Sequence, residues 1–259
     1  MFFTTSKANS WAIIKTCVAN TMKPVLILQH MRADSPAYLA TWLHGQGVAF
    51  TVCDSERGDV VPADIHGFSA LALLGGEMSA NDDLPALRQA EVLIRQAQAR
   101  AVPTLGHCLG GQLMARALGA RVVDSPKPEL GWHAMHIHDS DAARAWLGEP
   151  GNELVFQWHY DSFELPRGAT LLASSTACPR QAFAVGPHVA LQFHVELDAA
   201  KLAHWAGEAE TDARLLSAQA EFDTVQGATR MLAAQQERLA AQQRLADHIY
   251  ARWLSTAAS

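Results

Sequence analysis

A cysteine between two glycines is the residue of this chain best placed to do chemistry. Residues 106–110 read Gly-His-Cys-Leu-Gly, after an apolar run at 101–105 and before an amphipathic helical pattern at 112–118. This order predicts a strand, a sharp turn and a helix, with Cys108 on the turn. Glycine lacks the Cβ atom that would clash in so tight a bend, and a helix N-terminus favours negative charge on the sulfur. The pattern indicates a nucleophile that attacks a carbonyl carbon.

A histidine and a glutamate near residue 195 can activate such a nucleophile. His194 and Glu196 stand at the end of an apolar run, 189–193. Residues two apart in a strand point to the same face, so this spacing predicts contact between the two side chains. A carboxylate beside a histidine fixes its tautomer and stabilises the imidazolium. Cys108, His194 and Glu196 are therefore the predicted nucleophile, base and orienting carboxylate.

Five motifs in the same order resemble those of the class I glutamine amidotransferases of the triad type. They are an oxyanion loop at 73–79, a nucleophile elbow at 103–113, two middle motifs at 129–132 and 158–161, and a triad motif at 192–196. The resemblance runs over residues 22–197 and is closest to stand-alone proteins similar to the amidotransferase half of GMP synthase. The family usually has proline between the histidine and the glutamate. Here Val195 takes that place, which changes local stiffness but removes no catalytic group.

The resemblance implies both a fold and a reaction. The fold is α/β, flavodoxin-like, with a mainly parallel sheet, helices on both faces, a small antiparallel addition and C-terminal helices. The reaction is attack of Cys108 on the side-chain amide of glutamine, giving a γ-glutamyl thioester that water cleaves to glutamate after ammonia leaves. This chemistry needs no cofactor and no metal.

Further residues of the motifs receive roles by resemblance. The backbone N–H of Leu109, which follows the nucleophile, and that of Gly76 are the expected oxyanion donors. The expected substrate-binding residues are Gly75, Gln112, His159 and Asp161. Trp158 is interpreted equally well as a packing residue.

Hydrophobic patterning supports a parallel sheet in the first half of the chain. Strand signals at 25–28, 48–52 and 70–74 alternate with helical signals at 35–43 and 83–100. Such alternation predicts a sheet covered by helices on both faces, with ligands bound at the carboxyl ends of its strands.

The second half of the chain reads differently. Residues 132–138 alternate as in a half-exposed antiparallel strand, and shorter strands are expected near 154–157, 170–173 and 181–185. After residue 199 the pattern becomes helical, which predicts two or three amphipathic helices with a break near residues 226 and 227. We expect this tail to pack on the domain or to form a partner surface, and to carry no catalytic group.

Length and composition indicate a soluble globular protein with one large domain. The chain has 259 residues, 49% of them hydrophobic and 18% charged, and a net charge of −6. We expect a catalytic domain at 22–198, the tail at 199–259, and an N-terminal segment, 1–21, that is either a loose extension or the product of an upstream start codon. No basic run favours nucleic acid, and no apolar run approaches the ~20 residues that cross a membrane.

The other cysteines and a pair of histidines are interpreted as structural residues. The four cysteines lack C-x-x-C spacing, which favours reduced thiols and a cytoplasmic location, and Cys17, Cys53 and Cys178 are expected to be small buried residues. His136 and His138 share a strand face, but no further ligand is placed by spacing, so we expect no metal.

Three functions fit these observations. The first is a glutaminase that supplies ammonia to a separate synthetase, and the second is a hydrolase of γ-glutamyl compounds that uses water as acceptor. The third is a non-catalytic regulatory protein, which the intact triad disfavours. The chain has no phosphate-binding loop of the G-x-x-x-x-G-K-[ST] type, so it is not expected to use ATP by itself. The ammonia acceptor and homo-oligomer formation stay open.

Overall fold

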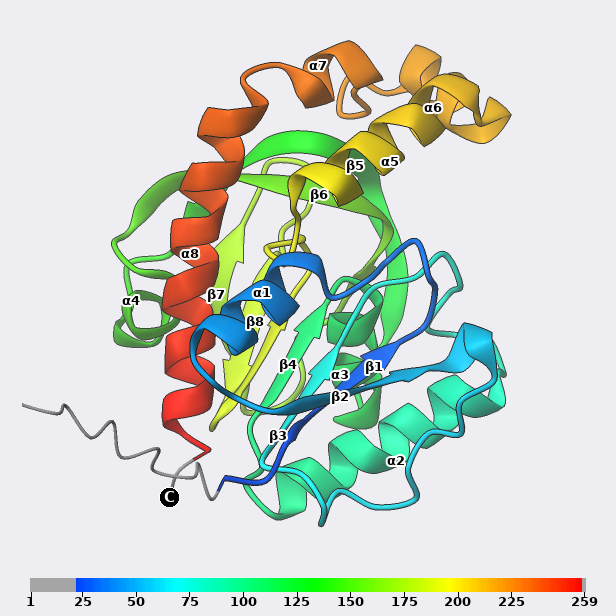
Figure 1. The fold of residues 1–259 in the computed structure, drawn as a ribbon. Coiled ribbons are helices and arrows are strands. Elements are labelled where there is room, and N and C mark those ends of the chain that lie inside the picture. The colour runs from blue at the N-terminus through cyan, green and yellow to red at the C-terminus, as the bar shows by residue number, and fades with distance from the viewer. Residues whose placement is uncertain (1–21, 258–259) are drawn as a thin grey trace, which may run out of the picture.

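The protein was analysed as a computed structural model, which describes residues 22–257; the predicted N-terminal extension lies outside them. The described residues form a nine-stranded sheet with the order β2-β1-β3-β4-β9-β8-β7-β5-β6 (Figure 1). Its parallel half consists of β2 (Phe50–Asp54), β1 (Val25–Gln29), β3 (Ala70–Leu73), β4 (Thr104–His107) and β9 (His188–Leu191). The parallel core predicted from the alternating pattern is confirmed.

The antiparallel half is larger than the short strands expected from the sequence. It consists of β8 (Ala182–Val185), β7 (Thr170–Ser174), β5 (Val122–Ile137) and β6 (Gly151–Phe163). The β5–β6 pair continues across a register shift between Asp124 and Glu129, where Pro126 and Pro128 interrupt the ladder. Proline is tolerated at such an irregularity, since no ladder N–H is needed there. The hydrophobic pattern of the sequence therefore predicts only part of the long strand β5.

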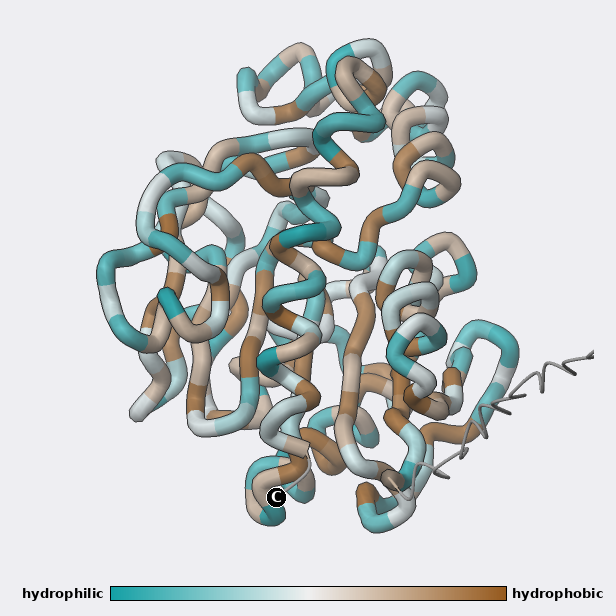
Figure 2. The backbone as a smooth tube through the Cα atoms, turned by 60° about the vertical axis from the view of Figure 1, so that its left-hand side comes forward, coloured by the Kyte–Doolittle hydropathy of each residue, from teal (hydrophilic) through white to brown (hydrophobic). Residues whose placement is uncertain are grey.

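Helices cover both faces of the sheet, as predicted. On one face lie α1 (Ala37–Gly45), α4 (Asp141–Leu147) and α8 (Gln235–Ser255), and on the other lie α2 (Pro85–Ala99) and α3 (Leu109–Ala117). A single 3-10 turn, η1 (Ser55–Arg57), follows β2. Two apolar clusters, one on each face, fill the space between sheet and helices. Figure 2 shows the hydrophobic residues concentrated along the strands and the hydrophilic ones on the outer loops.

The tail contains four helices, more than the two or three expected. They are α5 (Ala199–Thr211), α6 (Ala213–Glu221), α7 (Ala228–Leu232) and α8. Asp212 ends α5 and caps the N-terminus of α6 with its side chain, which divides one helical pattern into two elements. Gly227 is the N-cap of α7, at the predicted break. The α8 side chains of Tyr250 and Trp253 are fully buried against the sheet, whereas α5, α6 and α7 lie across the end of the β5–β6 pair (Figure 1).

Among residues 22–257, no helix combines the length and apolar character that crossing a membrane requires.

Candidate active site

The carboxyl ends of four neighbouring parallel strands converge on one pocket of about 620 Å³. Asp34 follows β1, Gly76 follows β3, Cys108 follows β4 and His194 follows β9, and all four line the pocket. Parallel sheets bind ligands at this edge because loops and helix N-termini meet there. The pocket is therefore where the sheet architecture predicts a ligand.

Cys108 occupies the expected turn between a strand and a helix. It is the N-cap of α3, and its backbone has φ 48° and ψ −110°. Positive φ is unusual for a residue with a side chain, and it persists only where the surroundings enforce it. Here the Cys108 N–H donates to Leu191 O at 2.8 Å, and Cys108 O accepts from Gln112 N at 3.0 Å. The neighbouring strand and the first helical turn thus hold the sulfur at the pocket.

Glycines around Cys108 allow α3 to touch the sheet with its backbone. A Cβ atom on Gly106 would lie 2.6 Å from the carbonyl carbon of Gly110, and one on Gly111 would lie 2.7 Å from Leu191 O. A Cβ atom on Gly110 would overlap the backbone of Leu73. The predicted need for glycine beside the nucleophile therefore arises from packing between helix and strand as well as from the bend.

Gly110→Ala should lower the free energy of unfolding by roughly 3 kcal/mol, because the added methyl group meets rigid backbone rather than a movable side chain. Urea unfolding followed by circular dichroism measures this change. Gly207→Ala in α5 is the matched control, since nothing lies within 4 Å of its Cβ position. Removing a helix-interior glycine there should stabilise the protein by about 0.5–1 kcal/mol. Equal effects of the two substitutions would contradict the packing argument.

His194 and Glu196 do contact each other, although the strand geometry used to predict it is wrong. Strand β9 ends at Leu191, and both residues lie in the bend and turn that follow. His194 Nδ1 lies 2.7 Å from Glu196 Oε1, and both side chains are almost fully buried. The turn, rather than a shared strand face, returns the carboxylate to the ring.

The other ring nitrogen of His194 is buried, and the residue lines the pocket. Its Nε2 atom has no hydrogen-bond partner within residues 22–257, and Cys108 lines the same pocket. Burial by itself would lower the pKa of His194, but the negative charge of Glu196 and the interaction with Cys108 outweigh it and raise the pKa to about 10. The imidazolium form is thus favoured through neutral pH.

A buried lysine completes the charge network, and sequence reasoning did not find it. Lys201 Nζ donates to Glu196 Oε1 at 2.8 Å and to Ser35 O at 3.0 Å, and it forms an ion pair with Asp34. Burial alone would raise the pKa of Glu196, but Lys201, His194 and His107 hold it well below its usual range. Because Lys201 lies in α5, the tail contacts the predicted triad through Glu196, while the expectation that it carries no catalytic group stays a prediction. Only its position five residues after Glu196 hinted at this contact.

The backbone donors expected to stabilise an oxyanion are available. Within the described chain, the N–H groups of Gly76 and Leu109 donate to no backbone or side-chain acceptor. Gly75 has a different use: a Cβ atom there would overlap Asp34 and lie 3.0 Å from His194 Cε1. Gly75 therefore makes room for the buried charges and does not line the pocket itself.

Gln112 and Asp161 are joined at the pocket wall. Gln112 Nε2 donates to the backbone oxygen of Asp161 at 3.2 Å, and Ser79 Oγ donates to Asp161 Oδ2 at 3.1 Å. All three residues line the pocket. A side-chain amide and a carboxylate are therefore available to a polar ligand beside Cys108.

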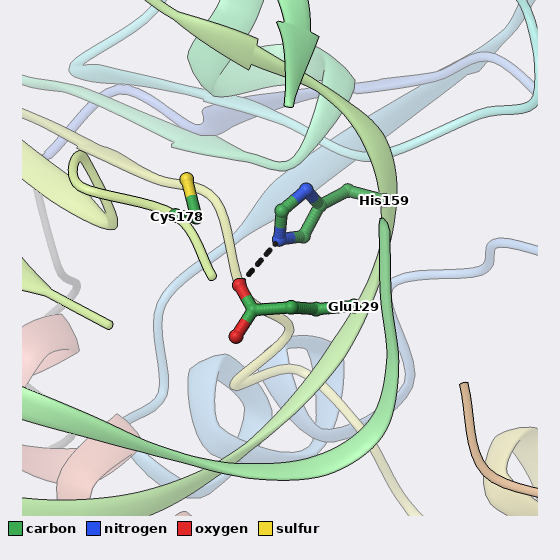
Figure 3. A group of neighbouring side chains, drawn as sticks. All are labelled: Glu129, His159 and Cys178. Atoms are coloured by element: carbon green, nitrogen blue, oxygen red, sulfur yellow. Dashed lines mark hydrogen bonds and ion pairs between the residues drawn. The ribbon is translucent and has the colours of Figure 1, made fainter. Parts of the chain in front are cut away.

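His159 forms a buried hydrogen bond with Glu129, and the Cys178 sulfur lies near both side chains (Figure 3). Glu129 and His159 are register partners on β5 and β6, and His159 Nε2 lies 3.2 Å from Glu129 Oε2. Glu129 also accepts from Ser175 Oγ at 2.8 Å and from Gln181 Nε2 at 2.6 Å. The Cys178 sulfur is itself bonded to other groups. Each of the three side chains already has hydrogen-bond partners in the protein, so the cluster is better described as a support for the 158–161 segment than as a metal site.

The other grouping of potential metal ligands already holds a cation. Asp34, His194 and Glu196 surround the ammonium of Lys201. His136, on β5, bonds through Nδ1 to Asn152, and His138, just after the end of β5, bonds through Nε2 to Ser174, so each histidine of the pair considered from the sequence has a protein partner.

Comparison with known proteins agrees with these features. The model of the family described as "Glutamine amidotransferase class-I" matches residues 46–203, more than half of the chain. The chain is similar to the glutamine amidotransferase-like protein YfeJ of Salmonella typhimurium, with 30% identity over 64% of this chain and 73% of that one. It is also similar to a glutamine-hydrolyzing GMP synthase subunit of Thermoplasma acidophilum, with 32% identity over 54% of this chain and 69% of that one.

A solved structure extends the similarity to almost the whole chain. A glutamine amidotransferase from Methylobacillus flagellatus is 37% identical, with a TM-score of 0.88, over 91% of this chain and 96% of that one. The match is longer than the family model, so the solved relative shares most of the tail.

Proposed function

This chain belongs to the class I glutamine amidotransferase family, and we propose that it cleaves the side-chain amide of glutamine or of a γ-glutamyl compound through Cys108, His194 and Glu196. One observation carries the proposal. His194 is held at Nδ1 by Glu196, its buried Nε2 atom has no hydrogen-bond partner in the described chain, and His194 lines the same pocket as Cys108. This is the arrangement that a cysteine nucleophile and its proton carrier require.

The reaction follows from these positions. The Cys108 sulfur attacks the amide carbon, forming the carbon–sulfur bond, and the carbonyl oxygen becomes an oxyanion near the N–H groups of Gly76 and Leu109. The carbon–nitrogen bond then breaks, and the proton on His194 Nε2 passes to the departing amine. Water attacks the γ-glutamyl thioester and gives a proton back to His194, which releases glutamate and restores the pair. Each oxyanion donor contributes about 3 kcal/mol in comparable sites.

The glutamyl half of the substrate is assigned to the wall that carries Gln112 and Asp161. Their hydrogen bonds fix the wall before a ligand arrives, and pre-ordered polar groups lose less entropy on binding. His159 contributes indirectly, because both of its ring nitrogens bond to protein atoms, Asp161 O and Glu129 Oε2.

Two fates of the nitrogen remain as alternatives. Ammonia could pass to a synthetase on a separate chain, as the similarity to a GMP synthase subunit suggests. Otherwise the chain works alone as a γ-glutamyl hydrolase. Activity of the purified chain on glutamine and on γ-glutamyl amides, with and without candidate synthetases, separates these alternatives.

An electrophilic glutamine analogue, 6-diazo-5-oxo-L-norleucine, should label Cys108 with one equivalent per chain. Cys53 and Cys178 serve as internal controls, since both are buried and neither lines the pocket. Peptide mass spectrometry locates the adduct. Full labelling of a folded Cys108→Ala variant would show that another group is the nucleophile and would reject the proposal.

A further inference from the structure

The tail builds one wall of the pocket, beyond the segment that the family model matches. That model ends at residue 203, within α5. The lining residues beyond it are Trp205, Glu208, Thr211, Asp212, Arg214 and Leu215, which we call the tail wall. The matched family chemistry therefore does not account for this surface.

The tail wall lies on the side from which the amine departs. His194 gives its proton to that amine, so the amine leaves next to the His194 ring. The ring of Trp205 meets the His194 ring edge to face, with centroids 4.7 Å apart. Glu208 follows Trp205 by three residues on the same helix face, and both line the pocket. A substituent on the departing amine would extend along this wall.

Negative charge dominates this end of the pocket. Glu77, Glu208 and Asp212 contribute three carboxylates there, against the guanidinium of Arg214 and the imidazolium of His194. Burial raises the pKa of Glu208, and the negative charges of Glu77 and Asp212 raise it further. His204, whose Nε2 atom lies 3.3 Å from Glu208 Oε1, lowers this pKa. These carboxylates therefore repel one another, and a bound cation would relieve the repulsion.

The chain already places cations over aromatic rings that line the pocket, and Lys201 Nζ lies 4.9 Å from the centroid of the Trp205 ring. The Arg214 guanidinium carbon lies 5.3 Å from the centroid of the Tyr160 ring, and Tyr160 lines the pocket beside Trp158. Aromatic faces together with carboxylates are a common way to bind organic cations. The pocket volume of about 620 Å³ also falls in the ~300–1,000 Å³ range of sites that enclose ligands larger than an amino acid.

We propose that the tail wall is a subsite for a cationic amine, so that the preferred substrates are γ-glutamyl amides whose amine half carries a positive charge, such as γ-glutamylated diamines. This inference rests on the proposed function, because the bond cleaved is the same amide. The Cys108 sulfur bonds to the carbonyl carbon of the γ-glutamyl amide, the carbon–nitrogen bond breaks, and His194 Nε2 gives its proton to the departing diamine nitrogen. Water then hydrolyses the thioester.

The test compares three substrates on the purified full-length chain: the γ-glutamyl amides of diaminobutane, butylamine and γ-aminobutyrate. They have similar length and differ in charge at the far end. The cationic amide should exceed the neutral one in kcat/KM by about tenfold, and the anionic amide should be slowest. The preference should shrink as salt is added, because partly exposed charges are screened.

Two glutamate variants on α5 test whether Glu208 produces the preference for the cationic amide. Glu208→Gln should reduce the ratio of kcat/KM for the cationic amide to that for the neutral amide by several-fold. Glu210→Gln, on the same helix but exposed and outside the pocket lining, should leave that ratio unchanged. If Cys108 is labelled and the neutral amide is cleaved, but the cationic amide has no advantage, the subsite is wrong and the hydrolase function stands. If Cys108 is not labelled and no amide is cleaved, the proposed function fails and the subsite fails with it.

Discussion

Replacing His194 with alanine should lower kcat/KM for glutamine by about 10⁴-fold or more, because the departing amine then leaves without a proton donor. His194 is the only ring in the described pocket lining that is held by a buried carboxylate through a 2.7 Å hydrogen bond and has its second nitrogen unpartnered. Steady-state release of glutamate measures the loss. His133→Ala is the control, since that residue lies on β5 and bonds to Leu130 O, away from the pocket.

Glu196→Gln should retain more activity than His194→Ala and should change the pH profile. The charge of Glu196 helps to raise the pKa of His194 to about 10, so its removal lowers that pKa. Activity depends on the imidazolium, and the alkaline limb of kcat/KM should therefore move to lower pH. A folded His194→Ala enzyme with near-native turnover, or a Glu196→Gln enzyme with an unmoved alkaline limb, would argue against the triad.

The residues of the proposed triad were predictable from the sequence because short motifs carry them. Cys108 sits on an elbow whose glycines and following helix are adjacent in the chain, and the parallel sheet that presents it follows from alternating patterns. His194 and Glu196 were found for a partly wrong reason, since they occupy a turn rather than a strand. Because the two residues are only two positions apart, their side chains can meet in a turn as well as on a strand.

The supporting residues were not predictable, because distant segments bring them together. Asp34 and Lys201 are separated by 167 positions, and no periodicity links a loop after β1 to a helix after β9. The tail wall was missed for the same reason. Its polar residues are typical of a solvated helix face, the apolar Trp205 is typical of core packing, and only the fold brings them together at the pocket.

Lys201→Met should lower the free energy of unfolding by about 3–5 kcal/mol at neutral pH, because it leaves two buried carboxylates without their cation. Lys201 joins Glu196 and Asp34, and all three side chains are at most 6% exposed. Lys127→Met is the control, since the pair that Lys127 forms with Asp223 at 3.3 Å is solvent-exposed. Its loss should cost less than about 1 kcal/mol.

The pH dependence of the Lys201 effect distinguishes charge pairing from simple packing. In the native chain the pKa of Glu196 is held below its usual 4.5, so this carboxylate stabilises the fold above pH 4.5 and that contribution is lost as the pH falls through the lower native pKa. Without Lys201 the pKa of Glu196 rises, and its contribution is already lost at a higher pH. The stability difference measured by urea unfolding should thus be largest near neutral pH and narrow below pH 4.5. Adding Asp34→Asn to Lys201→Met should recover part of the loss, because one unpaired charge is removed. A difference that is constant with pH, with no recovery in the double variant, would mean that Lys201 acts through packing and not as the cation that holds Glu196 beside His194.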